Sequence, residues 1–268
     1  MLYNAKNGTV TIGTATMDYI RFGTGKRTLV LLPGLGDGLQ TVKGTALAMA
    51  FMYREFAREF TVYAFSRKNA LPDGCTTRDM ARDQAEAMER LGITRADILG
   101  VSMGGMIAQW LAIDFPEKTG KLILTVTCAC PNPILEASVC EWVACARAGD
   151  HTAFMGSNLR RIYSEDYCRR NKWLVPILGK LTKPKSYDRF FLQADACLTH
   201  NAYEHLHRIK AQTLVIGGEK DLALGGEASV TLAAGIAGAG LHMYPQWGHG
   251  LYEEAKDFNR VVLAFLKE

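Results

Sequence analysis

The sequence lacks long hydrophobic runs and any strong imbalance of charge. No stretch of about 18 apolar residues occurs in the chain, so a membrane-spanning helix is not expected. The N-terminal residues have no basic stretch followed by an apolar run, so we expect no secretory signal and a cytoplasmic location. The net charge of +4 is too small to indicate a nucleic-acid partner. The sequence therefore predicts a globular protein with neither a membrane nor a nucleic acid as its partner, and it leaves the oligomeric state open.

The cysteines form neither a disulfide framework nor a zinc motif. There are seven, an odd number, and a chain of 268 residues buries enough apolar surface to fold without disulfides. Cys128, Cys130, Cys140 and Cys145 cluster, but no CxxC pair and no Cys–His pair at zinc spacing accompanies them. Reduced thiols are therefore expected, and a metal site is not.

Short apolar runs that are typical of β-strands recur along the chain. Most are rich in β-branched or aliphatic residues, and several end at a turn signal such as Pro33-Gly34. The expected strands are Thr9–Ile12, Thr16–Phe22, Thr28–Leu32, Thr61–Phe65, Ile98–Val101, Leu122–Val126, Thr213–Ile216 and Leu241–Tyr244.

Helical patterns lie between several of these runs. One of them places Met80, Ala87 and Leu91 on one face, and another stops before Pro116, as a helix should. The expected helices are Thr45–Glu59, Asp79–Leu91, Met103–Phe115 and Glu254–Leu266.

The order of these elements predicts the fold class. Apolar strands that alternate with helices indicate an α/β protein with a mostly parallel sheet covered on both faces. The first strands have no helix between them, so an antiparallel hairpin should begin the sheet. The alternation stops between about Cys128 and His207, where helical fragments and prolines replace strands. We therefore expect a core built from residues 1–127 and 208–268, with residues 128–207 inserted as a helical cap.

A candidate nucleophile lies at the end of the fifth expected strand. Residues 100–104 read GVSMG and fit the pattern G-x-S-x-G, between an apolar strand and an apolar helix. This setting favours a sharp strand-to-helix turn that exposes the Ser102 hydroxyl, and the glycines two positions away leave room for it. An idle serine in a tight turn is the alternative, but the strand and helix on either side favour a nucleophile.

A serine nucleophile needs a base, an acid and donors for an oxyanion. Of six histidines, His249 follows the last expected strand, and in a motif of this kind the acid and then the histidine come after the serine. Glu219 and Asp221 both follow the preceding strand and are candidate acids. The backbone N–H groups of Met103 and Leu35 are the expected oxyanion donors, and the loop around Leu35 lacks the glycine spacing of a nucleotide site.

Taken together, these motifs resemble the α/β-hydrolase superfamily, and most of all small bacterial carboxylesterases and 3-oxoadipate enol-lactonase-like serine hydrolases. The matching pieces are PGLG at 33–36, GVSMGG at 100–105, GGEKD at 217–221, WGHG at 247–250 and QADACLTH at 193–200. Pro33 stands where many relatives have histidine. The resemblance implies an α/β-hydrolase fold and the catalytic residues Ser102, Asp221 and His249.

The resemblance also implies a serine esterase that cleaves a small carboxylic ester or lactone without a cofactor. The same residues would suit a small-molecule sensor with slow turnover, an acyltransferase or perhydrolase, or a carbon–carbon bond hydrolase. Two features of the cap stay open. Its nine basic residues between 158 and 189 either attract anionic substrates or face solvent. Its large apolar residues either line a pocket or form the core of the cap, and these are Trp142, Phe154, Met155, Trp173 and Phe190.

Overall fold

In the computed structural model, which describes residues 2–268, eight strands form one sheet in the order β1-β2-β4-β3-β5-β6-β7-β8. Strands β1, β2 and β4 pair antiparallel, and all other pairs are parallel. The fold is the α/β-hydrolase fold, and the hairpin at its start is the one expected from the sequence. The strands are β1 (Lys6–Ile12), β2 (Ala15–Phe22), β3 (Arg27–Leu32), β4 (Phe60–Lys68), β5 (Ala96–Val101), β6 (Thr119–Thr125), β7 (Thr213–Gly218) and β8 (Gly240–Tyr244).

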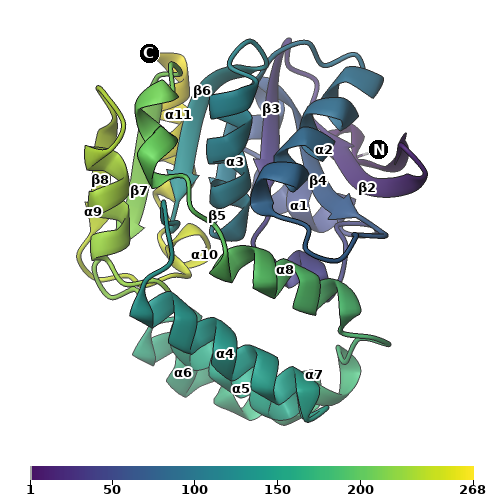
Figure 1. Cartoon of the computed structure of the whole chain (residues 1–268), viewed down its shortest axis with the longest axis vertical. Coiled ribbons are helices and arrows are strands. Elements are labelled where there is room, and N and C mark those ends of the chain that lie inside the picture. Colours follow the sequence, from purple (N-terminus) through teal and green to yellow (C-terminus); the bar gives the residue numbers. More distant parts are fainter. Residues whose placement is uncertain (1) are drawn as a thin grey trace.

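Helices cover both faces of the sheet (Figure 1). Helices α2 (Thr77–Arg90), α3 (Met103–Asp114) and α9 (Glu227–Ala234) pack on one face, and α1 (Ala46–Met52) and α11 (Phe258–Lys267) pack on the other. Strand β5 lies between neighbours on both sides and is buried along its whole length. Its carboxyl end is therefore a rigid place for a functional side chain.

Two expected helices are interrupted and one helix was not expected. The stretch Thr45–Glu59 divides into α1 and η3 (Phe56–Arg58), because Tyr53 and Phe56 turn inward and stack at 5.7 Å in the core. The expected helix Glu254–Leu266 begins too early: Glu254 is the last residue of α10 (Leu251–Glu254), the backbone is extended at Ala255, and α11 starts at Phe258. Tertiary packing overrides helix propensity at both places. Helix α9 is short and follows two glycines, which concealed it in the sequence.

Between β6 and β7 the described chain forms helices and no strand. They lie beyond the carboxyl ends of the parallel strands (Figure 1), and the predicted cap, residues 128–207, falls inside this stretch. The helices are α4 (Pro133–Arg147), α5 (His151–Ile162), α6 (Glu165–Asn171), η4 (Lys172–Leu174), α7 (Val175–Leu181), α8 (Asp188–Leu198) and η5 (Tyr203–Arg208). The remaining short helices, η1 (Leu2–Asn4) and η2 (Leu35–Gly38), belong to the core side.

None of the helices in residues 2–268 is both long enough and apolar enough to cross a membrane. Over the same residues, no three side chains of His, Cys, Asp or Glu come together as they would around a metal ion.

Candidate active site

Ser102 lies at a strained turn between β5 and α3. Its φ of 54° and ψ of −122° put it in a region that residues with a side chain seldom adopt. The Ser102 N–H donates to the carbonyl of Thr125 at 2.9 Å, and the Thr127 hydroxyl donates to the Ser102 carbonyl at 2.8 Å. A side chain at Gly104 would overlap the Leu32 carbonyl, so the turn requires a glycine there. The turn is thus fixed by its neighbours and presents the serine at the edge of the sheet.

His249 and Asp221 form a buried pair on the loops that follow β8 and β7. His249 Nδ1 lies 2.8 Å from Asp221 Oδ2, and both side chains are almost fully buried. Asp221 Oδ1 accepts the N–H groups of Ala223 and Leu224 at 2.8 and 2.9 Å, which fixes the carboxylate. Because a carboxylate accepts, Nδ1 carries the proton and Nε2 is free to act as a base. Glu219, the other candidate acid, is exposed.

The two loops that carry this pair are tied to each other and to the cap. The Lys220 N–H donates to the Trp247 carbonyl at 3.1 Å, which links the acid loop to the histidine loop. The Gly250 N–H donates to the carbonyl of Ile162, at the end of α5, at 2.6 Å. The position of the His249 imidazole therefore depends on the cap as well as on the sheet.

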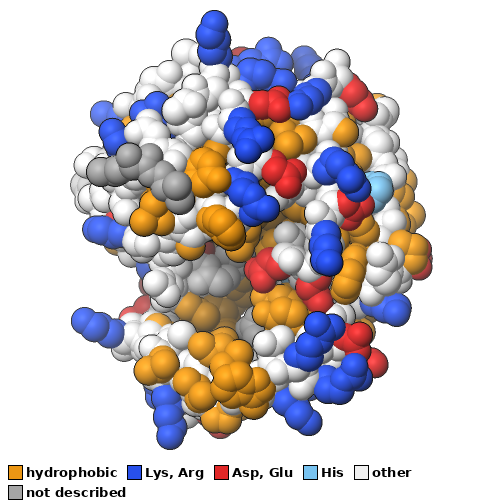
Figure 2. All heavy atoms as spheres, turned by 180° about the vertical axis from the view of Figure 1, so that it is seen from behind, with side chains coloured by type: hydrophobic (Ala, Val, Ile, Leu, Met, Phe, Trp, Pro, Cys, Tyr) orange, Lys and Arg blue, Asp and Glu red, His pale blue; other side chains and the backbone are white. Residues whose placement is uncertain are grey.

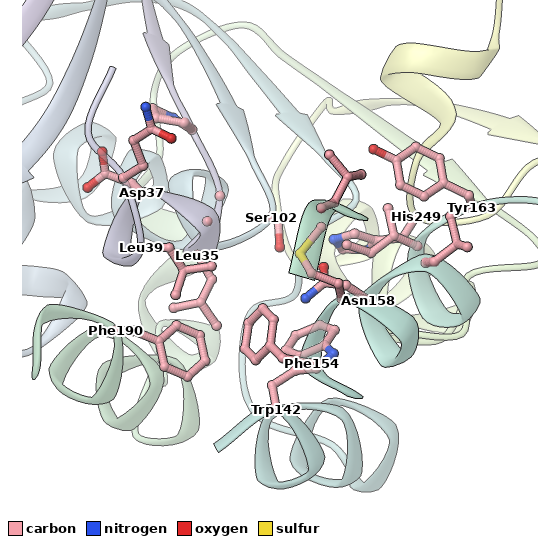
Figure 3. A pocket seen from close by; sticks show the side chains of 18 of the residues that line it. Leu35, Asp37, Leu39, Ser102, Trp142, Phe154, Asn158, Tyr163, Phe190 and His249 are labelled. Carbon is pink, nitrogen blue, oxygen red and sulfur yellow. The ribbon is translucent and has the colours of Figure 1, made fainter. Parts of the chain in front are cut away.

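The serine and the histidine face the same cavity. Both line a space of about 570 Å³ between the core and the cap, and Figure 3 shows their side chains turned toward each other. Among the described residues, no hydrogen bond joins Ser102 Oγ directly to His249. A serine–histidine contact that is long in the free protein and tightens around substrate is common in such sites.

The expected oxyanion donors lie beside the serine. Leu35 and Met103 are the first residues of η2 and α3, so their N–H groups have no acceptor within their own helices. No other hydrogen bond in residues 2–268 uses either N–H as donor. A Cβ at Gly34 would lie 3.3 Å from Ser102 Cβ, which shows how closely this loop approaches the serine. The geometry therefore leaves two backbone donors available next to the hydroxyl.

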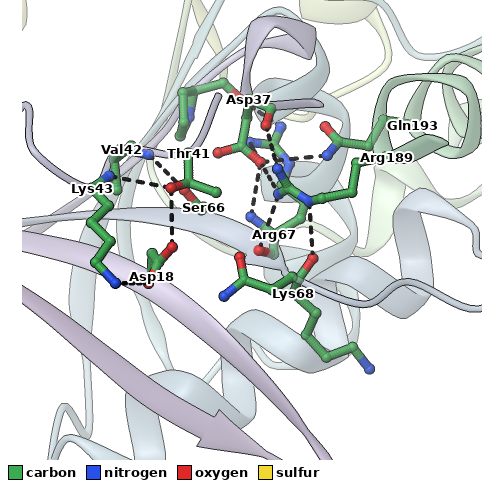
Figure 4. A network of polar contacts seen from close by, with 12 residues as sticks. Asp18, Asp37, Thr41, Val42, Lys43, Ser66, Arg67, Lys68, Arg189 and Gln193 are labelled. Atoms are coloured by element: carbon green, nitrogen blue, oxygen red, sulfur yellow. Dashed lines mark hydrogen bonds and ion pairs between the residues drawn. The ribbon is translucent and has the colours of Figure 1, made fainter. Parts of the chain in front are cut away.

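A buried ionic network holds the loop that contains Leu35 (Figure 4). Asp37 Oδ2 accepts the Arg67 N–H at 3.0 Å and an Arg189 N–H at 2.8 Å, and it lies 4.0 Å from Arg67 Nη1. The Arg67 guanidinium donates in turn to the Pro33 carbonyl. Arg189 belongs to α8, so the network joins the loop to β4 and to the cap. This network therefore anchors the loop that carries Pro33 and Leu35.

The cavity is mostly apolar, and four of the five large cap residues noted in the sequence line it. Trp142, Phe154, Met155 and Phe190 form part of its wall, whereas Trp173 is 65% exposed and lies outside. Figure 3 shows the two phenylalanines, the tryptophan and Leu35 gathered on the side away from His249.

Basic residues do not reach the cavity. Asp37 is the one Asp, Glu, Lys or Arg among the described residues that line it, and its carboxylate is occupied by Arg67 and Arg189. Of the nine basic residues of the cap, Arg160 and Arg161 pair with Glu141. The structure thus supports the interpretation of these charges as surface and anchoring groups, and not as a lining that holds an anionic substrate.

Comparison with known proteins agrees with the fold and the motifs. The family model described as "Alpha/beta hydrolase family" matches residues 29–261. The chain belongs to the alpha/beta hydrolase family. It is 29% identical over 255 residues to the 2-hydroxymuconate semialdehyde hydrolase of a Pseudomonas species, covering 90% of this chain and 87% of that one.

Two solved structures share the alpha/beta hydrolase fold over almost the whole chain. One is an alpha/beta hydrolase from a deep-sea metagenome library, with a TM-score of 0.84, 23% identity, and coverage of 97% of this chain and 98% of the other. The second is the enol-lactonase of Burkholderia xenovorans, with a TM-score of 0.80, 22% identity, and coverage of 97% and 100%.

Some residues of this alpha/beta hydrolase site were missed in the sequence. Asn158 and Tyr163 line the cavity from the cap side, and Figure 3 shows both side chains among those around the cavity that His249 also lines. No spacing rule marks such residues, because the helix face that meets the core is set only when the cap folds back. Asp37 was visible as a charge in a glycine-rich loop, but its partner Arg189 is 152 positions away.

Proposed function

We propose that this hydrolase cleaves a neutral carboxylic ester or lactone with an apolar acyl or alcohol part, through an acyl-enzyme on Ser102. The observation that carries the proposal is the combination of Ser102 at its strained turn, the His249–Asp221 pair at 2.8 Å, and an apolar cavity over both.

The first half of the reaction forms the acyl-enzyme. Ser102 Oγ attacks the carbonyl carbon while His249 Nε2 takes the hydroxyl proton, and Asp221 stabilises the imidazolium. The oxyanion accepts hydrogen bonds from the N–H groups of Leu35 and Met103. When the tetrahedral intermediate collapses, the bond to the leaving oxygen breaks, and His249 gives its proton to the departing alcohol.

The second half restores the enzyme. A water molecule attacks the acyl carbon and passes a proton to His249, and the second tetrahedral intermediate expels Ser102 Oγ, which takes that proton back. The products are a carboxylic acid and an alcohol, or a single hydroxy acid when the substrate is a lactone.

Carbon–carbon bond hydrolysis is the second candidate, because several relatives are named as hydrolases of oxo-dienoates or semialdehydes, which contain no ester bond. The 2-hydroxymuconate semialdehyde hydrolase mentioned above is one of them, and muconate names a carboxylate-bearing substrate. Buried charges in proteins are normally paired with an opposite charge or a metal ion. In the described cavity wall no Lys or Arg faces the interior, and Arg189 is already bound to Asp37. The lining therefore favours a neutral ester or lactone.

The test compares kcat/KM for a neutral ester and for its analogue with a terminal carboxylate. We expect the neutral ester to be hydrolysed at least about a hundredfold more efficiently, because the described cavity wall offers no cation to pair with the carboxylate. Equal or better turnover of the carboxylate analogue would contradict the proposal. Stoichiometric capture of the ester without turnover would identify a sensor, and faster reaction with an added alcohol or peroxide than with water would identify an acyltransferase or perhydrolase.

A further inference from the structure

Helices on opposite sides of the cavity, α1 on the core side and η4 and α7 on the cap side, expose large hydrophobic side chains. On the core side, Leu47 and Phe51 of α1 are 60% and 61% exposed. On the cap side, Trp173 of η4 and Leu181 of α7 are 65% and 78% exposed. Single exposed apolar residues are ordinary, but several around one opening mark an interaction surface.

These exposed side chains continue the wall of the cavity outward. Met49 of α1 and Leu178 of α7 line the cavity itself. Trp173, Ile177 and Leu181 are four residues apart and so form one stripe, and at helical spacing this stripe lies beside Leu178. Figure 2 shows hydrophobic side chains on both sides of the hollow between the core and the cap. Apolar surface therefore runs from outside the molecule toward Ser102.

The charged residues within the same two segments are all basic. Residues 41–54 and 171–187 contain no Asp or Glu. Lys43 lies 3.9 Å from Asp18, which offsets its charge. The four lysines of segment 171–187 are exposed. The basic residues of the two segments are Lys43, Arg54, Lys172, Lys180, Lys183 and Lys185.

The exposed apolar residues and the basic residues of segments 41–54 and 171–187 together form a face that we name the mouth surface. We propose that the mouth surface docks on a lipid surface that carries anionic headgroups, and that the ester enters the cavity from the lipid. The second statement rests on the proposed function. The apolar side chains enter the boundary between headgroups and acyl chains, while the cations contact the anionic headgroups. A peripheral contact with a lipid surface needs no membrane-spanning segment, so it is compatible with a sequence that contains no long apolar run.

A second copy of the chain is a poorer occupant of the mouth surface. Two-fold symmetric dimers bring the same patch of both subunits together. Lys43 is offset by Asp18, but the other five basic residues would then face another five, which opposes association. An anionic lipid surface complements both the charge and the apolar character.

The experiment measures cosedimentation with vesicles of phosphatidylcholine, with and without phosphatidylglycerol. The inactive Ser102→Ala protein is used, so that docking is measured apart from catalysis, and turnover of a soluble neutral ester by the wild type tests the proposed function separately. We expect binding to the mixed vesicles, weaker binding to phosphatidylcholine alone, and weaker binding as salt rises.

Paired variants locate the contact. Trp173→Ser/Leu181→Ser should weaken binding about tenfold, whereas Val230→Ser/Leu241→Ser, on α9 and β8 away from the mouth, should leave it within about twofold. Thermal unfolding shows whether each variant remains folded.

A charge pair gives an independent test. Lys180→Glu/Lys185→Glu should weaken binding to the mixed vesicles about tenfold. The control Lys26→Glu/Arg95→Glu changes the net charge by the same amount at exposed positions outside the mouth surface, and it should not weaken binding. Equal losses in test and control variants, or no wild-type binding to either vesicle, would overturn the proposal. So would a wild-type dimer that dissociates in Trp173→Ser/Leu181→Ser and binds no vesicles, because the face would then be a self-association surface.

Discussion

Asp37→Asn should destabilise the protein strongly although it changes almost nothing in shape. The Asp37 and Arg67 side chains are 0% and 1% exposed, and Arg189 at 2.8 Å is 19% exposed. An asparagine oxygen can still accept the Arg67 N–H, so the substitution removes mainly the negative charge. Arg67 then stays buried without its counterion. Breaking a buried pair in this way reduces the free energy of unfolding by about 3–5 kcal/mol.

The assay is equilibrium urea denaturation followed by tryptophan fluorescence, with Asp114→Asn as the matched control. Asp114 likewise accepts hydrogen bonds from an arginine, Arg78, which donates two of them. Because the Arg78 side chain is 38% exposed, water can solvate it, and removing the Asp114 charge should reduce the free energy of unfolding by about 1 kcal/mol or less. If Asp37→Asn is as mild as Asp114→Asn, the buried network does not hold the oxyanion loop in the way argued above.

Three further results are expected. Gly34→Ala should lower kcat by roughly a hundredfold in a p-nitrophenyl ester assay, because its Cβ would stand 3.3 Å from Ser102 Cβ, and an unchanged kcat would show that the loop can move aside. Asp221→Asn should lower kcat by about a thousandfold or more while Glu219→Gln leaves it within about twofold, and the reverse order would make Glu219 the acid. Burial lowers the pKa of His200 to about 3, so below pH 6.5 the unfolded chain takes up a proton that the folded protein does not. The free energy of unfolding should therefore fall by about 2 kcal/mol between pH 6 and pH 4.5, His200→Gln should flatten this dependence, and a pH dependence that His200→Gln leaves unchanged would rule out this origin.

The core of the fold was predictable because its signals are local. Strands such as Ala96–Val101 are buried on both faces, so they are continuous apolar runs, and the candidate site residues follow directly after strand ends. The glycine-flanked turn at Ser102 needs only the residues next to it. Parallel strands then bring these loops to one edge of the sheet, which is why residues far apart in sequence could be grouped in advance.

The parts that escaped prediction depend on contacts distant in sequence. The break at Tyr53 follows from packing in the core, and no glycine or proline marks it. In the sequence the basic residues of the cap are not distinguishable from one another. In the structure Arg189 turns inward to Asp37, whereas Arg160 and Arg161 pair with Glu141. Which basic residues are buried depends on the packing of α8 against the loop after β3. The periodicity of hydrophobic residues in the sequence does not indicate that contact.

The central claim is that Ser102 forms a covalent acyl-enzyme, and active-site labelling tests it most directly. The protein is treated with a fluorophosphonate, which reacts with activated serines, and the modified peptide is located by mass spectrometry. We expect one adduct, on Ser102, together with loss of neutral-ester turnover, and we expect neither labelling nor turnover in Ser102→Ala. Labelling at another residue, or ester hydrolysis that persists in Ser102→Ala, would contradict the account.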